Sequence, residues 1–329
     1  MARLSYAGFA GWIKSIAAYL RAHRTLSLAL QITIVVATIA FCAWAVRKEW
    51  AKAGPLLRNA RPGFVGLAFA AVAAYYLVFI LGWIRMLGAW GIDVAYRAAL
   101  QAEMVSMLAK YIPGAVWTPA ARTVALRRSA GVTDTPTVLA SILVEAALST
   151  ISGVIVFVIS LAWVRGVDAP LLPLVAFAVF CAFLIHPRVF RRLGDRLLKP
   201  FGADGVDALP FPLMLGLLVF YCMTWLIGGF ALYFLLRSVG SNPGLETIPF
   251  LGGVAAVGAI VAVLAVFAPS GLGAREATMY GLLLAVTSPD AALAVTLMNR
   301  LVITLVELIL FGVGVLTWRS RRRESPVPG

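Results

Sequence analysis

The pattern of the chain is dominated by long apolar stretches in which charged residues are absent or rare. Four long stretches contain no charged residue, namely 26–46, 63–84, 210–236 and 247–272. The shorter stretch 170–185 is also uncharged, and the stretches 137–164 and 291–318 contain one and two charges. A helix rises about 1.5 Å per residue and the hydrocarbon core is about 30 Å thick, so most of these stretches are long enough to cross a membrane.

This pattern predicts an all-α polytopic membrane protein with about seven or eight transmembrane segments. In this prediction residues 26–318 form one transmembrane domain. Residues 1–25 precede it as an interfacial helix, because apolar residues recur there at helical spacing. Residues 319–329 follow it as a basic tail. With 62% hydrophobic residues, the chain is far more apolar than a soluble domain of its length.

Two apolar stretches are interrupted in a similar way by proline, glycine and arginine, at 113–122 and at 269–276. Backbone groups without partners are costly in hydrocarbon, so a broken helix survives only where protein or water covers the break. In transporters, interrupted segments at corresponding places in two halves point to the binding site. We therefore predict two broken or re-entrant helices in pseudo-symmetric halves, with a substrate site between them.

The first interruption has the residues of an anion site. Pro113 and Gly114 end one helix, and a new helix begins near Pro119. The free N–H groups at the start of that helix, together with Arg122 and Lys110, would hold an anion such as phosphate. The alternative is a kinked loop whose basic residues only contact surface lipid.

The second interruption repeats these features with different residues. Gly271 and Gly273 allow the backbone to approach other backbone or a ligand closely. Arg275 is a candidate ligand for an anionic head group, and Glu276 suits the start of a helix. The alternative is an ion pair, either between these two residues or across helices, that only holds the loop together.

Three charged residues lie inside predicted spans, Glu145 in 137–164 and both Arg300 and Glu307 in 291–318. Isolated charges in the membrane are costly, so we expect these side chains to face a cavity or one another. Arg300 and Glu307 are seven residues apart and therefore lie on one helix face. A structural ion pair between helices is the alternative to a role in binding a head group or a proton.

The formal net charge of +14 would suggest a nucleic-acid partner in a soluble protein. Here the basic residues flank apolar stretches, so membrane orientation and lipid head groups explain them, and we expect no nucleic acid. The basic run 319–323 predicts a cytoplasmic C-terminus, and we favour a cytoplasmic N-terminus with a re-entrant segment at 99–118. The sequence contains no metal-ligand or nucleotide-binding motif, so we expect neither a metal nor a cofactor.

The sequence also resembles a known family. Residues 110–117, Lys-Tyr-Ile-Pro-Gly-Ala-Val-Trp, followed by Arg122, resemble the first signature of the lysylphosphatidylglycerol synthase transmembrane, or flippase-like, family. Residues 268–276, Ala-Pro-Ser-Gly-Leu-Gly-Ala-Arg-Glu, resemble its second signature, and residues 141–145 resemble a third. The resemblance covers roughly residues 25–318.

The chain departs from the family pattern at several charged positions. Many members carry a glutamate before the arginine of the first signature, where this chain has Ala120 and Ala121. Many also carry an arginine and an aspartate after the glutamate of the middle span, where this chain has Ala146 and Ser149. The resemblance therefore implies a family role without specifying the substrate.

In two-part members of the family, this region resembles a flippase for aminoacylated phosphatidylglycerol, which a separate soluble domain makes. The resemblance implies a stand-alone member without that synthase domain, in the bacterial cell (inner) membrane. Our leading hypothesis is a non-enzymatic lipid translocase that binds the phosphate of an anionic or polyprenyl-phosphate-linked lipid in a mid-membrane cavity. The alternatives are a membrane-embedded glycosyl or lipid transferase, and a non-transporting partner subunit of a cell-envelope lipid synthase.

The expected partners follow from these hypotheses. Membrane lipids that carry phosphate are the expected ligands, and a separate lipid synthase or glycosyltransferase is a candidate protein partner. An oligomer is compatible with the sequence. In the leading hypothesis four cations hold the head group, and three carboxylates balance its charge or gate its movement. The cations are Lys110, Arg122, Arg275 and Arg300, and the carboxylates are Glu145, Glu276 and Glu307.

Overall fold

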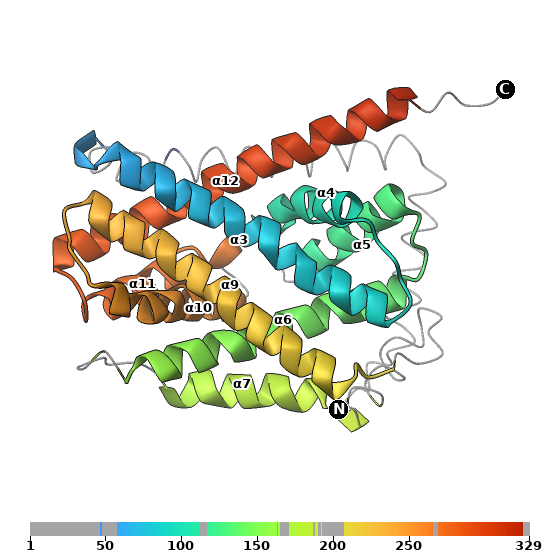
Figure 1. Ribbon diagram of the computed structural model, residues 1–329, viewed down its shortest axis with the longest axis horizontal. Helices are drawn as coiled ribbons and strands as arrows, with labels where there is room; N and C mark the ends of the chain where they lie inside the picture. Colours follow the sequence, from blue (N-terminus) through green and yellow to red (C-terminus); the bar gives the residue numbers. More distant parts are fainter. Residues whose placement is uncertain are drawn as a thin grey trace, which may run out of the picture.

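The computed structural model describes residues 58–111, 117–162, 171–186, 207–265 and 269–324, with a few single residues beside them. The predicted interfacial helix, the predicted span at 26–46, Pro113 and Gly114 lie outside these residues. Throughout the described segments the regular structure is helical (Figure 1).

Five segments of the described chain are long and apolar enough to cross a membrane. They are α3 (Pro62–Ala89), α6 (Thr135–Ser160), α9 (Phe211–Ser238), η3 with α10 (Leu245–Leu264) and the Pro289–Leu316 part of α12 (Pro289–Glu324). A shorter apolar helix, α7 (Leu171–Ile185), packs against α6. These helices confirm the predicted all-α polytopic membrane protein.

The first interruption is the turn of a helical hairpin. The first hairpin consists of α4 (Tyr96–Ser106), the short 3-10 helix η1 (Met107–Tyr111) and α5 (Trp117–Ala130). Near the end of α5, the Ser129 hydroxyl donates to the carbonyl of Ala98 at the start of α4, at 3.2 Å. The two arms are therefore antiparallel and return to the side from which they came, as predicted for a re-entrant segment. The predicted bounds 99–118 were too short, because the return arm is α5 and the hairpin extends from Tyr96 to Ala130.

The second interruption also forms a hairpin, made of α10 (Ile248–Leu264), the 3-10 turn η4 (Pro269–Gly271) and α11 (Ala274–Leu283). The hydroxyls of Ser241 and Thr287, just before and just after this second hairpin, lie 2.8 Å apart. Its two ends therefore meet on one side, and α11 returns to that side.

The predicted glycines are required at the tip of the second hairpin. Gly271 and Gly273 have positive φ angles of 68° and 87°, and Ser270 between Pro269 and Gly271 has a φ of 51°. A Cβ atom on Gly271 would lie 2.5 Å from the Cα of Ala262, whereas one on Gly273 would meet nothing within 4 Å. Close backbone approach therefore explains Gly271, and backbone conformation alone explains Gly273.

The two hairpins belong to two inverted repeats, α3 to α6 and α9 to α12. The equivalent helices α3 and α9 are antiparallel neighbours, because the Arg61 amide donates to Ser238 O at 2.9 Å and the Trp90 indole donates to Asp207 O at 2.7 Å. The packing repeats as well, since α6 lies against α10 just as α12 lies against α4. Helix α7 supplies the extra crossing that inverts the second repeat.

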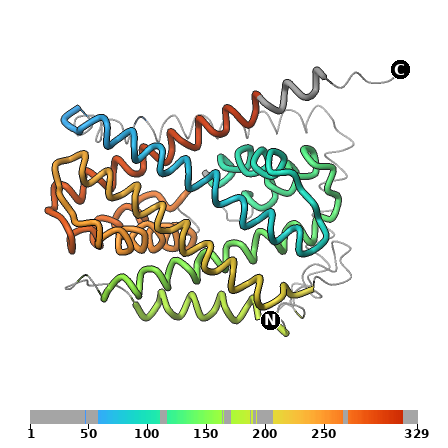
Figure 2. The backbone as a smooth tube through the Cα atoms, viewed as in Figure 1, coloured from blue at the N-terminus to red at the C-terminus, as the bar shows by residue number. Residues whose placement is uncertain are grey.

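This inversion brings the hairpin tips together inside the protein. In the orientation of Figures 1 and 2, the first hairpin enters from the right and the second from the left. Cα atoms of η1 and η4 approach within 8 Å, and α12 packs against both hairpins. In inverted-repeat transporters, ligand sites lie where such interrupted helices meet near the bilayer midplane. The residues around η1 and η4 are therefore the candidates for a ligand site.

Candidate functional site

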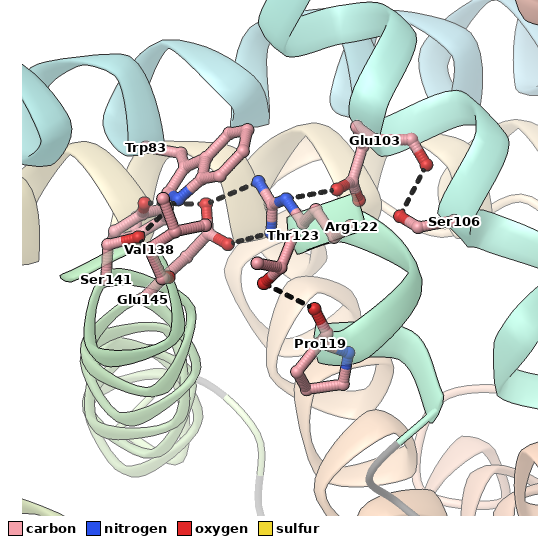
Figure 3. A network of polar contacts seen from close by, with 10 residues as sticks. Trp83, Glu103, Ser106, Pro119, Arg122, Thr123, Val138, Ser141 and Glu145 are labelled. Atoms are coloured by element: carbon pink, nitrogen blue, oxygen red, sulfur yellow. Dashed lines mark hydrogen bonds and ion pairs between the residues drawn. The ribbon is translucent and has the colours of Figure 1, made fainter. Parts of the chain in front are cut away.

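The most buried charged cluster surrounds Arg122 on α5 (Figure 3). Its Nε lies 2.8 Å from an oxygen of Glu103 on α4. Its terminal nitrogens donate to both oxygens of Glu145 on α6. Arg122 and Glu145 are only 4% and 3% exposed. One guanidinium thus joins three helices of the first repeat and is shared by two carboxylates.

Aromatic side chains of α3 and α9 enclose this cluster. The face of Trp83 lies 3.7 Å from the guanidinium carbon of Arg122, a cation–π contact. The Trp83 indole donates to the hydroxyl of Ser141 at 2.8 Å, which fixes the ring (Figure 3). Tyr221 donates to Glu145 at 3.3 Å. These contacts hold Arg122 in one position and leave little room for an anion to bind to it directly.

A second ion pair lies at the tip of the second hairpin. Arg300 on α12 donates to the carbonyl of Ser270 at 3.0 Å and to Glu276 at 3.3 Å. The other carboxylate oxygen of Glu276 accepts the amide of Gly273 at 2.7 Å, so this side chain also caps α11. The cross-helix ion pair that was the alternative interpretation of Glu276 is therefore present.

A third ion pair connects α12 to the tip of the first hairpin. Glu307 is fully buried and accepts hydrogen bonds from Lys110 on η1 and from Tyr76 on α3. The Lys110 side chain remains 30% exposed. Arg300 and Glu307 share one helix face, as predicted, but they do not pair with each other. Each instead contacts a different hairpin tip, so α12 bridges the two repeats.

Arg275 differs from the other three predicted cations. It lies at the start of α11 with its side chain half-buried, and its stem lies against α10 near Gly258. Its charge is close enough to interact with Lys110 and Tyr75, which lie on the first repeat. Among the described residues it makes neither an ion pair nor a side-chain hydrogen bond. Of the predicted cations, Arg275 is therefore the one that has no carboxylate partner among the described residues.

The ion pairs of the two repeats correspond, but with their charges exchanged. In the first repeat, an arginine on the second hairpin arm pairs with a glutamate 23 positions later on the next span. In the second repeat, a glutamate on the second hairpin arm pairs with an arginine 24 positions later. Four buried polar positions of α6 also correspond to four of α12, each pair being 155 residues apart: Ser141 with Thr296, Glu145 with Arg300, Ser149 with Thr304 and Ser152 with Glu307.

Among the described residues, Glu103 adds a second carboxylate on one side of the site and Arg275 adds a further cation on the other, so the two sides have opposite net charges. Around the first hairpin, Arg122 faces two carboxylates, Glu103 and Glu145. At the two tips and on the part of α12 that contacts them, the described residues include three cations and two carboxylates: Lys110, Arg275 and Arg300 with Glu276 and Glu307. The arrangement can therefore attract an anion to one side and a cation to the other.

Reasoning from the sequence missed the residues that complete these contacts. Glu103 lies on a short helix and was not assigned to the site. Tyr76 and Trp83 lie in the uncharged stretch 63–84 and were not assigned to the site, although they are seven residues apart and so share one face of α3. That spacing of polar-tipped aromatics in an uncharged span was the available signal. Tyr221 on α9 carried no comparable signal.

No group of three or more histidine, cysteine or acidic residues that could hold a metal ion occurs in the part of the chain that the structure describes. Residues 28–310 match the family described as the lysylphosphatidylglycerol synthase TM region. Comparison with curated proteins gave no match to the chain. The family match covers most of the chain, including both hairpins and every charged residue of the site. The protein is therefore a multi-pass membrane protein that belongs to the lysylphosphatidylglycerol synthase transmembrane-region family.

Proposed function

We propose that this protein moves a phosphate-bearing lipid between the two leaflets of the membrane and holds its head group between the hairpin tips. The observation that carries the proposal is the meeting of η1 and η4 at a point where Arg275 has no carboxylate partner among the described residues. An arginine inside the membrane lowers the cost of carrying an anionic head group there. The lipid leaves chemically unchanged.

Two further cations would assist Arg275. Lys110 is 30% exposed beside the tips, so its ammonium is accessible to a phosphate while it still pairs with Glu307. Arg300 supports the tip of the second hairpin through Ser270 and Glu276, and so positions the helix start that carries Arg275. Arg122 has a different role in this proposal. Its guanidinium already pairs with two carboxylates and lies against an aromatic ring, so in this proposal it fixes the first hairpin and does not bind the phosphate.

The arrangement of basic residues suggests the membrane orientation. On the side from which the first hairpin enters, the described exposed arginines are Arg85, Arg97, Arg127, Arg128, Arg188 and Arg192. The opposite side has Arg58, Arg61 and Arg237. Basic residues concentrate on the cytoplasmic side of membrane proteins. We therefore propose that the first hairpin and the C-terminal end of α12 face the cytoplasm of a bacterial inner membrane.

The proposal is tested in proteoliposomes made of phosphatidylcholine with a smaller share of phosphatidylglycerol, which gives the bilayer a negative surface. Phosphatidylglycerol labelled on an acyl chain reports transfer between leaflets, because its head group stays intact. We expect the wild type to accelerate transfer over protein-free vesicles and Arg275→Ala to lose most of that acceleration. Arg127→Ala is the matched control, since it removes an exposed arginine outside the site. Equal transfer by Arg275→Ala and wild type would contradict the site.

A further inference from the structure

We propose that the cluster of Glu103, Arg122 and Glu145 is a proton-binding site, and that one proton binds there for each anionic head group that the protein moves. The inference rests on the function proposed above, which it extends by naming a co-substrate. Binding of one proton per lipid would make the movement of an anionic lipid electrically neutral, and a proton gradient would then drive that movement.

The charge balance of the two sides is the first argument. Among the described residues, the cluster around Arg122 has one cation and two carboxylates, while the two tips and the part of α12 that contacts them have three cations and two carboxylates. Excess charge away from water is costly, on either side. A phosphate monoanion neutralises the second side, and a proton neutralises the first. Binding of both together leaves the whole site without net charge.

The geometry indicates which carboxylate takes up the proton. Both oxygens of Glu145 accept hydrogen bonds, from Arg122 and Tyr221, and the side chain is 4% exposed. Glu103 contacts the guanidinium only through Nε, at 2.8 Å, and is 17% exposed. Glu103 thus has the fewer partners and the better access to water. The step is the addition of one proton from water to a Glu103 carboxylate oxygen, and no other bond forms or breaks.

The groups that face Glu103 and Glu145 are not themselves available to accept a proton, so these two carboxylates are the proton acceptors of the cluster. Helix α5 contributes Arg122, which stays protonated, and α9 contributes Tyr221, which already donates to Glu145. Helix α3 contributes Trp83 and Tyr75, the latter within electrostatic range of both carboxylates. Farther along, Lys110 and Glu307 neutralise each other. Helices α7 and α10, which pack on α6, contain no charged residue.

Protonation would act on the first hairpin through one contact. The ion pair between Glu103 and Arg122 joins α4 to α5, while the pair with Glu145 joins α5 to α6. A neutral Glu103 weakens the first pair and leaves the second in place. The arm that leads into η1, and so to Lys110, then loses its charged link to the rest of the cluster. Proton uptake by Glu103 is thereby coupled to the ability of η1, the tip of the first hairpin, to move.

A pH gradient across proteoliposomes tests this coupling. The probe is acyl-labelled phosphatidylglycerol in the vesicles described above. For one proton per lipid, a difference of one pH unit should drive accumulation in the leaflet on the alkaline side, up to about tenfold over the other leaflet. Glu103→Gln should move the lipid without accumulating it, and protein-free vesicles give the background. Asp93→Asn, which removes an exposed carboxylate in the loop before α4, should accumulate lipid like the wild type.

The outcomes separate the two proposals. Even distribution by the wild type under the gradient would overturn proton coupling and leave lipid movement intact. Absence of any lipid movement would overturn the proposed function, and the proton site is then decided by a second measurement. Tryptophan emission of the purified protein should show a pH-dependent step, because Trp83 lies against the Arg122 guanidinium. That step should vanish in Glu103→Gln and in Trp83→Phe, and persist in Asp93→Asn; a step that persists in Glu103→Gln would overturn the site.

Discussion

Glu145 and Arg300 hold equivalent positions in the two inverted repeats and carry opposite charges. Each lies on the long helix that follows a re-entrant hairpin, and each pairs with the second arm of that hairpin, Glu145 with Arg122 and Arg300 with Glu276. The repeats therefore conserve the geometry of the contact while exchanging its sign. Each pair is neutral on its own, so the opposite net charges of the two sides come from Glu103 and Arg275.

Removal of Arg122 should strongly destabilise the protein. Arg122→Ala leaves Glu103 and Glu145 buried without a cation, and loss of one partner of a buried ion pair costs about 3–5 kcal/mol. A lower unfolding temperature in detergent would report this loss. The double variant Arg122→Glu with Glu145→Arg reproduces the order found in the second repeat and should recover part of the stability. Arg127→Ala should unfold like the wild type. A double variant no more stable than Arg122→Ala would contradict the equivalence of the two pairs.

The two glycines at the tip of the second hairpin should differ in their tolerance of alanine. Gly271→Ala places a methyl group 2.5 Å from the Cα of Ala262 and also strains a residue with positive φ. Gly273→Ala meets only the conformational penalty, about 1–2 kcal/mol. Thermal unfolding should therefore rank Gly271→Ala well below Gly273→Ala. Gly281→Ala, with open space and an ordinary helical conformation, is the control and should change little. The reverse ranking would contradict the close approach of this tip to α10.

The contact between Lys110 and Glu307 should be detectable in native membranes. In a background without the natural cysteines, the pair Lys110→Cys and Glu307→Cys should cross-link when treated with a short thiol-specific reagent, because the two side chains touch. The pair Lys110→Cys and Arg300→Cys serves as the comparison, since Arg300 lies about 10 Å further along α12. A shift in gel mobility after cleavage between the positions measures the cross-link. Stronger cross-linking in the comparison pair would place the first tip elsewhere on α12.

Single cysteines should report the proposed orientation. Arg97→Cys and Arg127→Cys lie on the side of the first hairpin, and we expect an impermeant thiol reagent to label them only after cells are opened. Glu246→Cys lies at the opposite side, beside the start of α10, and should react in intact cells. The labelling is compared with and without permeabilisation. The opposite pattern would invert the orientation and leave the fold unchanged.

The sequence predicted the parts of this protein that depend on local chemistry. Long runs without charge predict membrane helices because hydrocarbon tolerates only apolar side chains and internally bonded backbone. Proline and glycine at 113–114 and 269–273 predict where helices break. Charged residues inside the spans, such as Glu145 and Glu307, predict a buried polar site because they are too costly to face lipid. For these reasons the fold class and most of the cluster residues follow from the pattern alone.

Only the tertiary structure decided which charges meet. Arg300 and Glu307 share a helix face in the sequence, yet they contact different hairpins because the repeats are inverted and their tips meet across α12. Glu103, Tyr76 and Trp83 joined the site for the same reason, since local sequence does not specify a partner on another helix. Tyr76 and Glu307, for example, are 231 positions apart. Partner choice among charged groups depends on how helices pack, and packing is a property of the whole chain.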